Sequence, residues 1–215
     1  VADARAEAQL SYRLDGPHVA VVLSSETQQS AGRFEAVSEA VMAASGASSR
    51  LTLLAGANEV WVWYPVARLV VPEFDGGADG VLIAAGSVGH GREGFRRSHF
   101  QALSTRRLLR RFASSRRFAT YDDLRLVDVM ADDDQRLDDF VAQTLGELAA
   151  ADDLRECLHA WFAEECNASA TARRLYTHRN TVVRRIARAQ ELLPIPLNRN
   201  AIAVAAALEL AHWRE

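Results

Sequence analysis

One stretch of the chain, residues 167–193, brings together side chains that can bind nucleic acid. Read at helical period, it gives a short helix, a three-residue turn at 176–178 and a longer helix. The longer helix has an apolar stripe whose members recur at spacings of four, three and four: Val182, Ile186, Ala189 and Leu193. The opposite face and its flanks carry polar residues: Arg179, Asn180, Thr181, Arg184, Arg185 and Arg188.

The chemistry of this polar face suits the major groove of DNA. Arginine binds guanine edges with two hydrogen bonds, asparagine pairs with adenine, and threonine or arginine binds phosphates. Residues 173–188 hold six arginines, one histidine and no acid. The alternative is a solvated basic face on an ordinary helical hairpin, but the short helix, turn and arginine face occur in the order of a DNA-binding helix-turn-helix. We therefore expect double-stranded DNA as the partner.

Composition sets the frame for this motif. The 215 residues are 49% hydrophobic and 25% charged, which is typical of a soluble globular protein with one large or two small domains. There is no signal peptide and no apolar run of membrane-spanning length, so we expect a cytoplasmic protein with no membrane partner. Cys157 and Cys166 are nine residues apart on or beside one predicted helix and are read as free thiols. No metal site, no cofactor and no catalytic residue is expected.

The first half of the chain has the pattern of an α/β sandwich. A buried strand at 18–23 and a helix at 26–44 precede a predicted hairpin of two strands, 51–54 and 60–64. The remaining predicted elements are a strand at 81–85, a glycine-rich turn at 86–91, a long arginine-rich helix and an edge strand at 118–121. This order predicts a sheet of four or five strands with helices packed on it. Trp61 and Trp63 alternate with valines and lie either on an exposed interface or under a helix.

The second half is predicted to be helical, and we expect a domain boundary near 149–151, giving domains 1–150 and 151–215. Pro194 and Pro196 end the arginine helix, and Asn198 or Asn200 can cap a last helix that runs through Trp213. Residues 92–117 carry nine arginines against one acid, whereas residues 121–156 carry twelve acids against three arginines. These two blocks could pair with each other.

Three motifs in the second half carry a family resemblance. N-x-S-A-T-A-R-x-L at 167–175, H-R-N-T-V at 178–182 and R-R-I at 184–186 closely resemble the C-terminal helix-turn-helix domain of PucR/CdaR-type bacterial transcription regulators. The resemblance implies phosphate contacts from Asn167, Ser169, Thr181 and Arg184. It implies base-edge contacts from His178, Arg179 and Asn180. Thr177, in the turn, stands where the family usually has valine or isoleucine, and Val183 takes a place that is often polar in relatives.

The first half resembles the GGDEF-like domain of the same regulators, through G-R-E-G-F-R-R-S at 91–98 and Y-D-D-L at 121–124. The predicted fold class is therefore α+β, a degenerate GGDEF-like sandwich followed by an all-α helix-turn-helix domain. The hairpin loop at 56–60 occupies the position of the signature of diguanylate cyclases, which need carboxylates to hold two metal ions. Here Asn58 and Ala57 depart from that signature and the first strand ends in Ser24 and Ser25, so cyclase activity is expected to be absent.

Two further expectations concern assembly and a rival function. One recognition helix covers few base pairs, so we expect a homo-oligomer, a dimer whose half-sites lie about 34–36 Å apart or a multiple of that. The GGDEF-like domain, the last helix, or both would supply the symmetry.

The chain begins at Val1 without methionine, which suggests a fragment lacking an upstream sensor domain for a small-molecule effector. The rival is a nucleotide- or anion-binding sensor or enzyme module in the α/β half, at the glycine turn 86–91, with the helical part as an assembly element. The same turn also approximates a serine elbow around Ser87.

Overall fold

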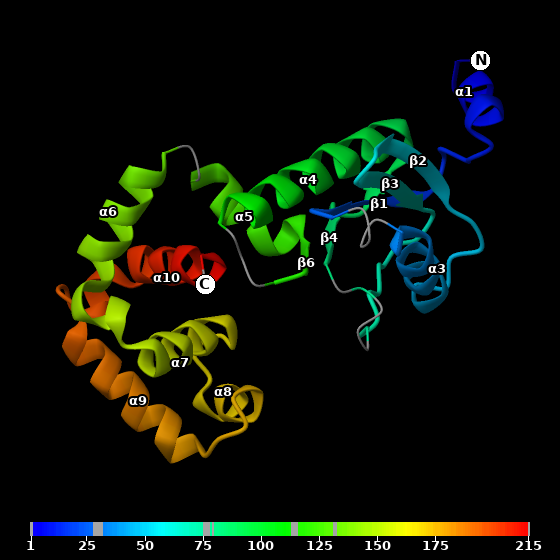
Figure 1. The fold of residues 1–215 in the computed structure, drawn as a ribbon. Helices are drawn as coiled ribbons and strands as arrows, with labels where there is room; N and C mark the ends of the chain where they lie inside the picture. The colour runs from blue at the N-terminus through cyan, green and yellow to red at the C-terminus, as the bar shows by residue number, and fades with distance from the viewer. Residues whose placement is uncertain are drawn as a thin grey trace. The chain divides into compact units, whose positions relative to one another are not determined.

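The structure of the chain is a computed structural model that describes residues 2–27, 32–74, 78, 80–112, 116–130 and 133–214 (Figure 1). The chain divides into two compact units, Val1–Asp128 and Val129–Glu215. The first unit is built on a sheet and the second is helical, which confirms the predicted α+β class. No helix among the described residues is both long enough and apolar enough to cross a membrane.

The first unit contains a six-stranded mixed sheet. Its elements are α1 (Ala2–Leu10), β1 (Pro17–Ser25), α3 (Phe34–Ala44), β2 (Leu51–Gly56), β3 (Glu59–Tyr64), β4 (Val81–Ala85), β5 (Gly89–His90), α4 (Gly91–Arg111), β6 (Phe118–Thr120) and α5 (Tyr121–Met130). The strand order is β2-β3-β1-β4-β6, and β5 pairs with the start of β1. Strand β1 runs antiparallel to β3 and β4, whereas β4 and β6 are parallel. The predicted order of strands and helices is confirmed, including the β2–β3 hairpin, and the short β5 within the predicted turn at 86–91 adds a strand to the four or five expected.

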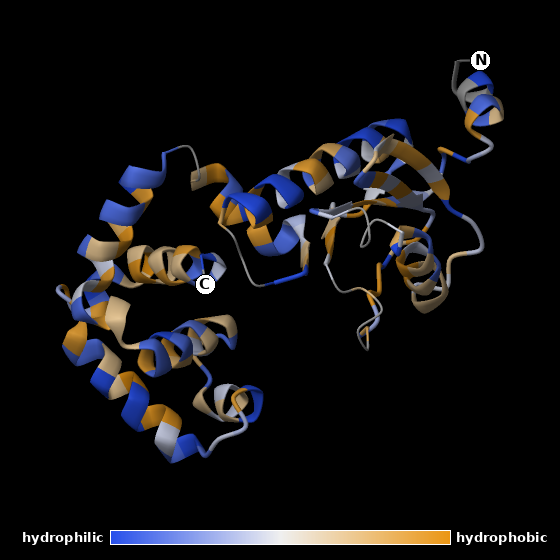
Figure 2. Ribbon diagram, in the orientation of Figure 1, coloured by the Kyte–Doolittle hydropathy of each residue, from blue (hydrophilic) through white to orange (hydrophobic). Residues whose placement is uncertain are grey.

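A helix packs on each face of this sheet, because the side chains of each strand alternate between the two faces. On one face, valines of β1, β3 and β4 form a buried core with Phe34, Val37 and Val41 of α3. On the other face, the Ser98 hydroxyl of α4 accepts a hydrogen bond of 2.8 Å from the backbone N–H of Ala20. Figure 2 shows α4 with alternating hydrophilic and hydrophobic bands, as expected for a helix with one buried side.

The two tryptophans of β3 lie under α4. The Trp63 ring is stacked on Phe95 with centroids 4.7 Å apart, and Trp61 lies 4.3 Å from the His99 ring. Of the two interpretations left open by the sequence, the structure therefore supports packing beneath a helix. His99 is half-buried between these rings, and burial lowers its pKa.

The glycine-rich turn before α4 allows the helix to approach the sheet closely. A Cβ atom on Gly86 would lie 2.0 Å from the backbone oxygen of Ser98, and one on Gly89 would lie 2.2 Å from that of Gly94. Ser87 donates a hydrogen bond of 2.9 Å to the Asp122 carboxylate, and none of its described contacts is with a histidine. The turn therefore serves packing, and the serine-elbow interpretation receives no support from it.

The second unit consists of α6 (Asp134–Leu145), the 3₁₀ turn η1 (Gly146–Ala150), α7 (Asp152–Ala163), α8 (Ala168–Arg174), α9 (Arg179–Leu192) and α10 (Leu197–Trp213). These elements share one apolar core, to which α6, α7, α9 and α10 all contribute. Helix α6 packs on α10, so it lies with the helical unit. The division after Asp128 therefore comes earlier in the chain than the expected boundary near 150. The acidic surface of α6 gave no sign of which core its buried Leu137 and Leu145 would join.

Helix α10 begins earlier than the two predicted asparagine caps. Its N-cap is Pro196, without a side-chain cap, and Asn200 has non-helical backbone angles that break the helix after its first turn. Glu209 holds α10 against α7, because its carboxylate lies 2.8 Å from His159 Nε2 and accepts a 2.8 Å hydrogen bond from Trp213. Cys157 is buried and Cys166 exposed, both as free thiols, and burial raises the pKa of the Cys157 thiol.

The opposite charge blocks pair in one described place within the first unit. Arg107 of α4 lies 3.0 Å from Asp128 of α5. Its neighbour Arg106 instead pairs with Glu59 on β3, at the start of the strand that follows the hairpin loop. The arginines of α4 therefore divide between the acidic segment and the sheet.

Candidate nucleic-acid interface

The side chain of Asn167 caps the N-terminus of helix α8. Asn167 Oδ1 accepts hydrogen bonds from the backbone N–H groups of Ser169 and Ala170, at 3.0 and 3.1 Å. Thr171 is buried and donates its hydroxyl to the Asn167 carbonyl at 2.8 Å. Because an asparagine cap fixes where a helix begins, the short α8 keeps a defined start despite its length of seven residues.

The turn between α8 and α9 is tight and places an aromatic side chain in solvent. Tyr176 has a φ of 48°, in the left-handed region that a side chain seldom adopts, and it is 98% exposed. The next residue, Thr177, donates its backbone N–H to the Ala172 carbonyl at 2.9 Å. His178 is the N-cap of α9 and has an extended backbone. The predicted turn at 176–178 thus lies between the two helices, and it begins one residue earlier, at Leu175, the C-cap of α8.

Helix α9 has one buried side and one exposed side. The predicted apolar stripe is confirmed, since Val182, Ile186 and Ala189 are buried in the core of the unit with Leu193. The other side is open to solvent and carries His178, Arg179, Asn180, Arg184 and Arg188. A helix anchored in this way presents its outer side chains as one rigid ridge, which is the form that fits a major groove.

Ion pairs divide the arginines of α9 into two groups. Arg185 lies 3.6 Å from Asp153 of α7, and Arg188 lies 2.6 Å from Glu191 one turn along α9. Arg179 and Arg184 have no ion-pair partner among the residues that the structure describes. The unpaired guanidinium groups therefore belong to the N-terminal half of α9.

The remaining predicted residues are placed around this half of α9. Ser169 is exposed at the start of α8, whereas Thr177 and Thr181 are half-buried. The Asn167 oxygen is occupied by its capping bonds, so only its amide nitrogen is left for a partner. Asn180 is exposed beside Arg179. The structure thus gathers the predicted set on α8, the turn and α9.

Sequence reasoning passed over two residues near this ridge. Arg173, at the end of α8, is exposed and has no ion-pair partner in the described part of the chain, unlike Arg174, which lies 3.2 Å from Glu164. Tyr176 was counted only as a turn residue. The sequence does contain a signal for Tyr176, because the residue that closes a helix in the left-handed conformation is usually glycine or asparagine, and here it is a tyrosine.

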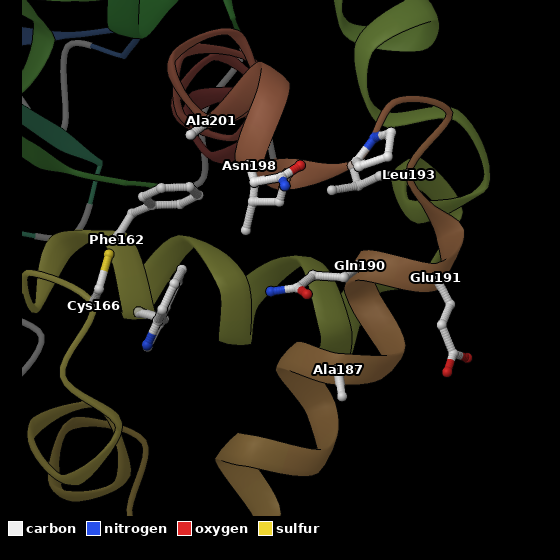
Figure 3. Close-up of a pocket in the computed structure, with 11 residues that line it drawn as sticks. Phe162, Cys166, Ala187, Gln190, Glu191, Leu193, Asn198 and Ala201 are labelled. Carbon is white, nitrogen blue, oxygen red and sulfur yellow. The ribbon is translucent and has the colours of Figure 1, made fainter.

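A groove of about 720 Å³ lies at the other end of α9 (Figure 3). Aromatic side chains of α7 form one wall, and the end of α9 and the start of α10 form the others. Gln190 and Asn198 place amide groups at it, and Cys166 lies at its edge. The groove is at the C-terminal end of the helix, so it is separate from Arg179 and Asn180.

In the hairpin loop of the first unit, the residues at the position of the cyclase signature make contacts within the unit. Glu59 forms an ion pair with Arg106, and the two side chains are 18% and 27% exposed. Asn58 accepts a backbone hydrogen bond of 3.1 Å from Ser25 at the end of β1. The acid of this loop is therefore engaged by an arginine, and the end of β1 offers two serines where a pair of metal ions would need carboxylates.

Comparison with known proteins identifies both units. Residues 154–211 match the PucR C-terminal helix-turn-helix domain, and residues 2–108 match the GGDEF-like domain. Among solved structures, the chain is similar to a regulator of polyketide synthase expression from Bifidobacterium adolescentis. The identity is 17%, over 99% of this chain and 86% of that chain, and the TM-score is 0.42. A comparison with curated proteins gives no match.

The helix-turn-helix and its family define the class of protein: the chain is a DNA-binding transcriptional regulator. With a GGDEF-like domain preceding that motif, it belongs to the PucR/CdaR-type bacterial transcriptional regulators. The resemblance given by the sequence motifs is thereby confirmed.

Proposed function

We propose that this regulator reads specific DNA sequences by placing the N-terminal half of α9 in the major groove. The observation that supports this most is that Arg179 and Arg184 are exposed, without an ion pair to any described residue, on a helix whose other side is buried. Arg179 and Asn180 lie at the start of α9, where recognition helices contact base edges. Arginine there selects guanine and asparagine selects adenine.

Phosphate contacts would fix the register of α9 in the groove. Ser169, Thr181 and Arg184 are the candidates from the sequence, and the exposed Arg173 joins them. Arg188 remains a candidate because its pair with Glu191 is more than half exposed on both sides. Such a surface ion pair is weak, so a phosphate can replace the carboxylate. The same holds for Arg185, whose partner Asp153 is 82% exposed.

The functional unit would be a homodimer. One α9 helix covers only a few base pairs, so useful specificity needs two half-sites separated by one or more turns of the duplex. Binding at two half-sites also raises the effective concentration of the second helix, which adds affinity without new contacts.

The α/β unit would have no cyclase activity. Glu59 is held by Arg106, and Asn58 stands in place of the loop acid. Incubation of the chain with GTP and Mg²⁺ should give no cyclic product. Turnover of GTP would show that this part of the proposal is wrong.

Selection from a random duplex pool tests sequence recognition. The unsubstituted chain should enrich a motif with two half-sites, and Arg179→Ala should relax one base position at a cost of about 1–3 kcal/mol. Arg68→Ala is the matched control, because Arg68 is also exposed and has no ion pair with the described residues, but lies in the first unit. An identical motif from Arg179→Ala and the unsubstituted chain would contradict the assignment of α9.

A further inference from the structure

We propose that two copies of the chain join through strand β2, by antiparallel pairing of the two β2 edges across a two-fold axis. Strand β2 is the end of the strand order, and Leu51 to Leu54 pair with β3 on one side only. The other side pairs with no strand among the described residues. An unpaired edge presents a row of free backbone N–H and C=O groups, whose natural partner is another extended strand.

The composition of β2 leaves this edge unprotected. Proteins usually guard sheet edges with charged residues or proline, or by keeping the edge strand very short. The sequence of β2, Leu-Thr-Leu-Leu-Ala-Gly, has neither charge nor proline, and Leu53 and Leu54 are 47% and 75% exposed. The opposite edge, β6, follows the rule, since it has only three residues and leads directly into α5.

The charged residues next to β2 are turned away from the edge. Arg50, immediately before the strand, has a side chain only 14% exposed because it pairs with Glu35 and Glu39 of α3. Glu59, beyond the hairpin loop, pairs with Arg106 of α4. Arg50 and Glu59 therefore place no uncompensated charge at the edge of β2.

The surroundings of β2 are complementary to its own leucines. Neighbouring strand residues point to opposite faces, so Leu53 and Leu54 lie on different faces of the sheet. On the face of Leu54, a groove of about 510 Å³ is lined by Leu54 itself, by Phe34, Ser38 and Val60, and by Glu35, which pairs with Arg50. In an antiparallel two-fold pair each copy offers the other the same strand, leucine and groove, which is the requirement for a closed dimer.

The expected dimer is weak. Stable complexes bury about 800 Å² per partner, and one six-residue strand with two exposed leucines supplies less than that. The association should therefore depend on chain concentration. This inference rests on the proposed function in one respect only, namely that a DNA site with two half-sites gives the dimer its use.

Sedimentation velocity of the full chain without DNA tests the pairing. A concentration-dependent dimer is expected, and Leu54→Lys should raise its dissociation constant about tenfold or more. Leu126→Lys is the matched control, because Leu126 is 48% exposed on α5 in the same unit, and it should leave dimerisation unchanged. A chain that stays monomeric up to about 0.1 mM, or a Leu54→Lys variant that dimerises normally, would overturn the inference. Neither result would bear on DNA binding by α9.

Disulfide cross-linking gives a second test, which does not depend on whether the Leu54→Lys variant folds. Thr52→Cys, Leu53→Cys and Leu54→Cys are made one at a time with the exposed Cys166 replaced by serine. Oxidation should cross-link two copies efficiently for the position nearest the two-fold axis, whereas Leu126→Cys should give little product. Equal cross-linking at Leu126→Cys and at all three β2 positions would show that β2 is not the contact.

Discussion

Replacing Arg184 by alanine isolates one phosphate contact of α9. Arg184 is exposed and has no ion-pair partner in the described part of the chain, so its removal releases no buried acid. Each phosphate contact contributes about 0.9 to the slope of log K against log salt. Over a fourfold rise in salt, from about 50 to 200 mM, the affinity of Arg184→Ala should therefore fall about 3.5-fold less than that of the unsubstituted chain.

The assay is a fluorescence anisotropy titration on a random-sequence duplex at several salt concentrations. Arg68→Ala is the matched control, since it removes the same charge from an exposed arginine of the first unit that has no ion pair with the described residues. We expect no change of slope for Arg68→Ala. An unchanged slope for Arg184→Ala, or equal changes in both variants, would refute the reasoning because the effect would then reflect net charge alone.

Two further predictions concern the stability of the first unit. Gly86→Ala places a Cβ atom against the Ser98 backbone and should lower the free energy of unfolding, measured in urea, by about 1–3 kcal/mol. Gly16→Ala is the control, because a Cβ atom there meets open space and should leave the free energy unchanged. Equal urea midpoints for the two variants would contradict the close approach of α4 to the sheet. Burial lowers the pKa of His18 and of His99 below the ordinary value of 6.5, so the unfolded chain binds protons first as pH falls, and stability that is fully present above pH 6.5 is lost below it. His99→Leu should reduce this loss of stability, because His99 Nε2 has no hydrogen-bond partner among the described residues. The loss is measured as the difference between urea midpoints at about pH 7.5 and about pH 5.5. If the variant shows the same pH dependence as the unsubstituted chain, His99 is not the cause of the loss.

The helix-turn-helix could be predicted closely because its signals are local. The spacing of Val182, Ile186 and Ala189 identifies the buried side of α9, and the basic residues between them identify the other side. The use of individual side chains could not be predicted in the same way. Arg185 meets Asp153 on α7, a residue far away in sequence, and periodicity contains no information on that contact.

The first unit could be predicted in its elements but not in their arrangement. The order of strands and the hairpin follow from short apolar runs bounded by turn residues, yet the central place of β1 between β3 and β4 depends on pairings across the whole unit. The placing of α6 in the helical unit could not be predicted for a similar reason. An apolar stripe on α6 shows that the helix is buried, but not that α10 covers it.

The packing of α6 on α10 gives the second unit a mechanical property. Arg214, just after α10, pairs with Asp138 and lies 3.9 Å from Asp134, both on α6, so the entry and the exit of this unit are fastened to each other. Helix α9 is instead supported by α7, α8 and η1. A force that reaches the unit through its incoming polypeptide therefore acts first on the α6–α10 contact, and it reaches α9 only through the apolar core that these helices share.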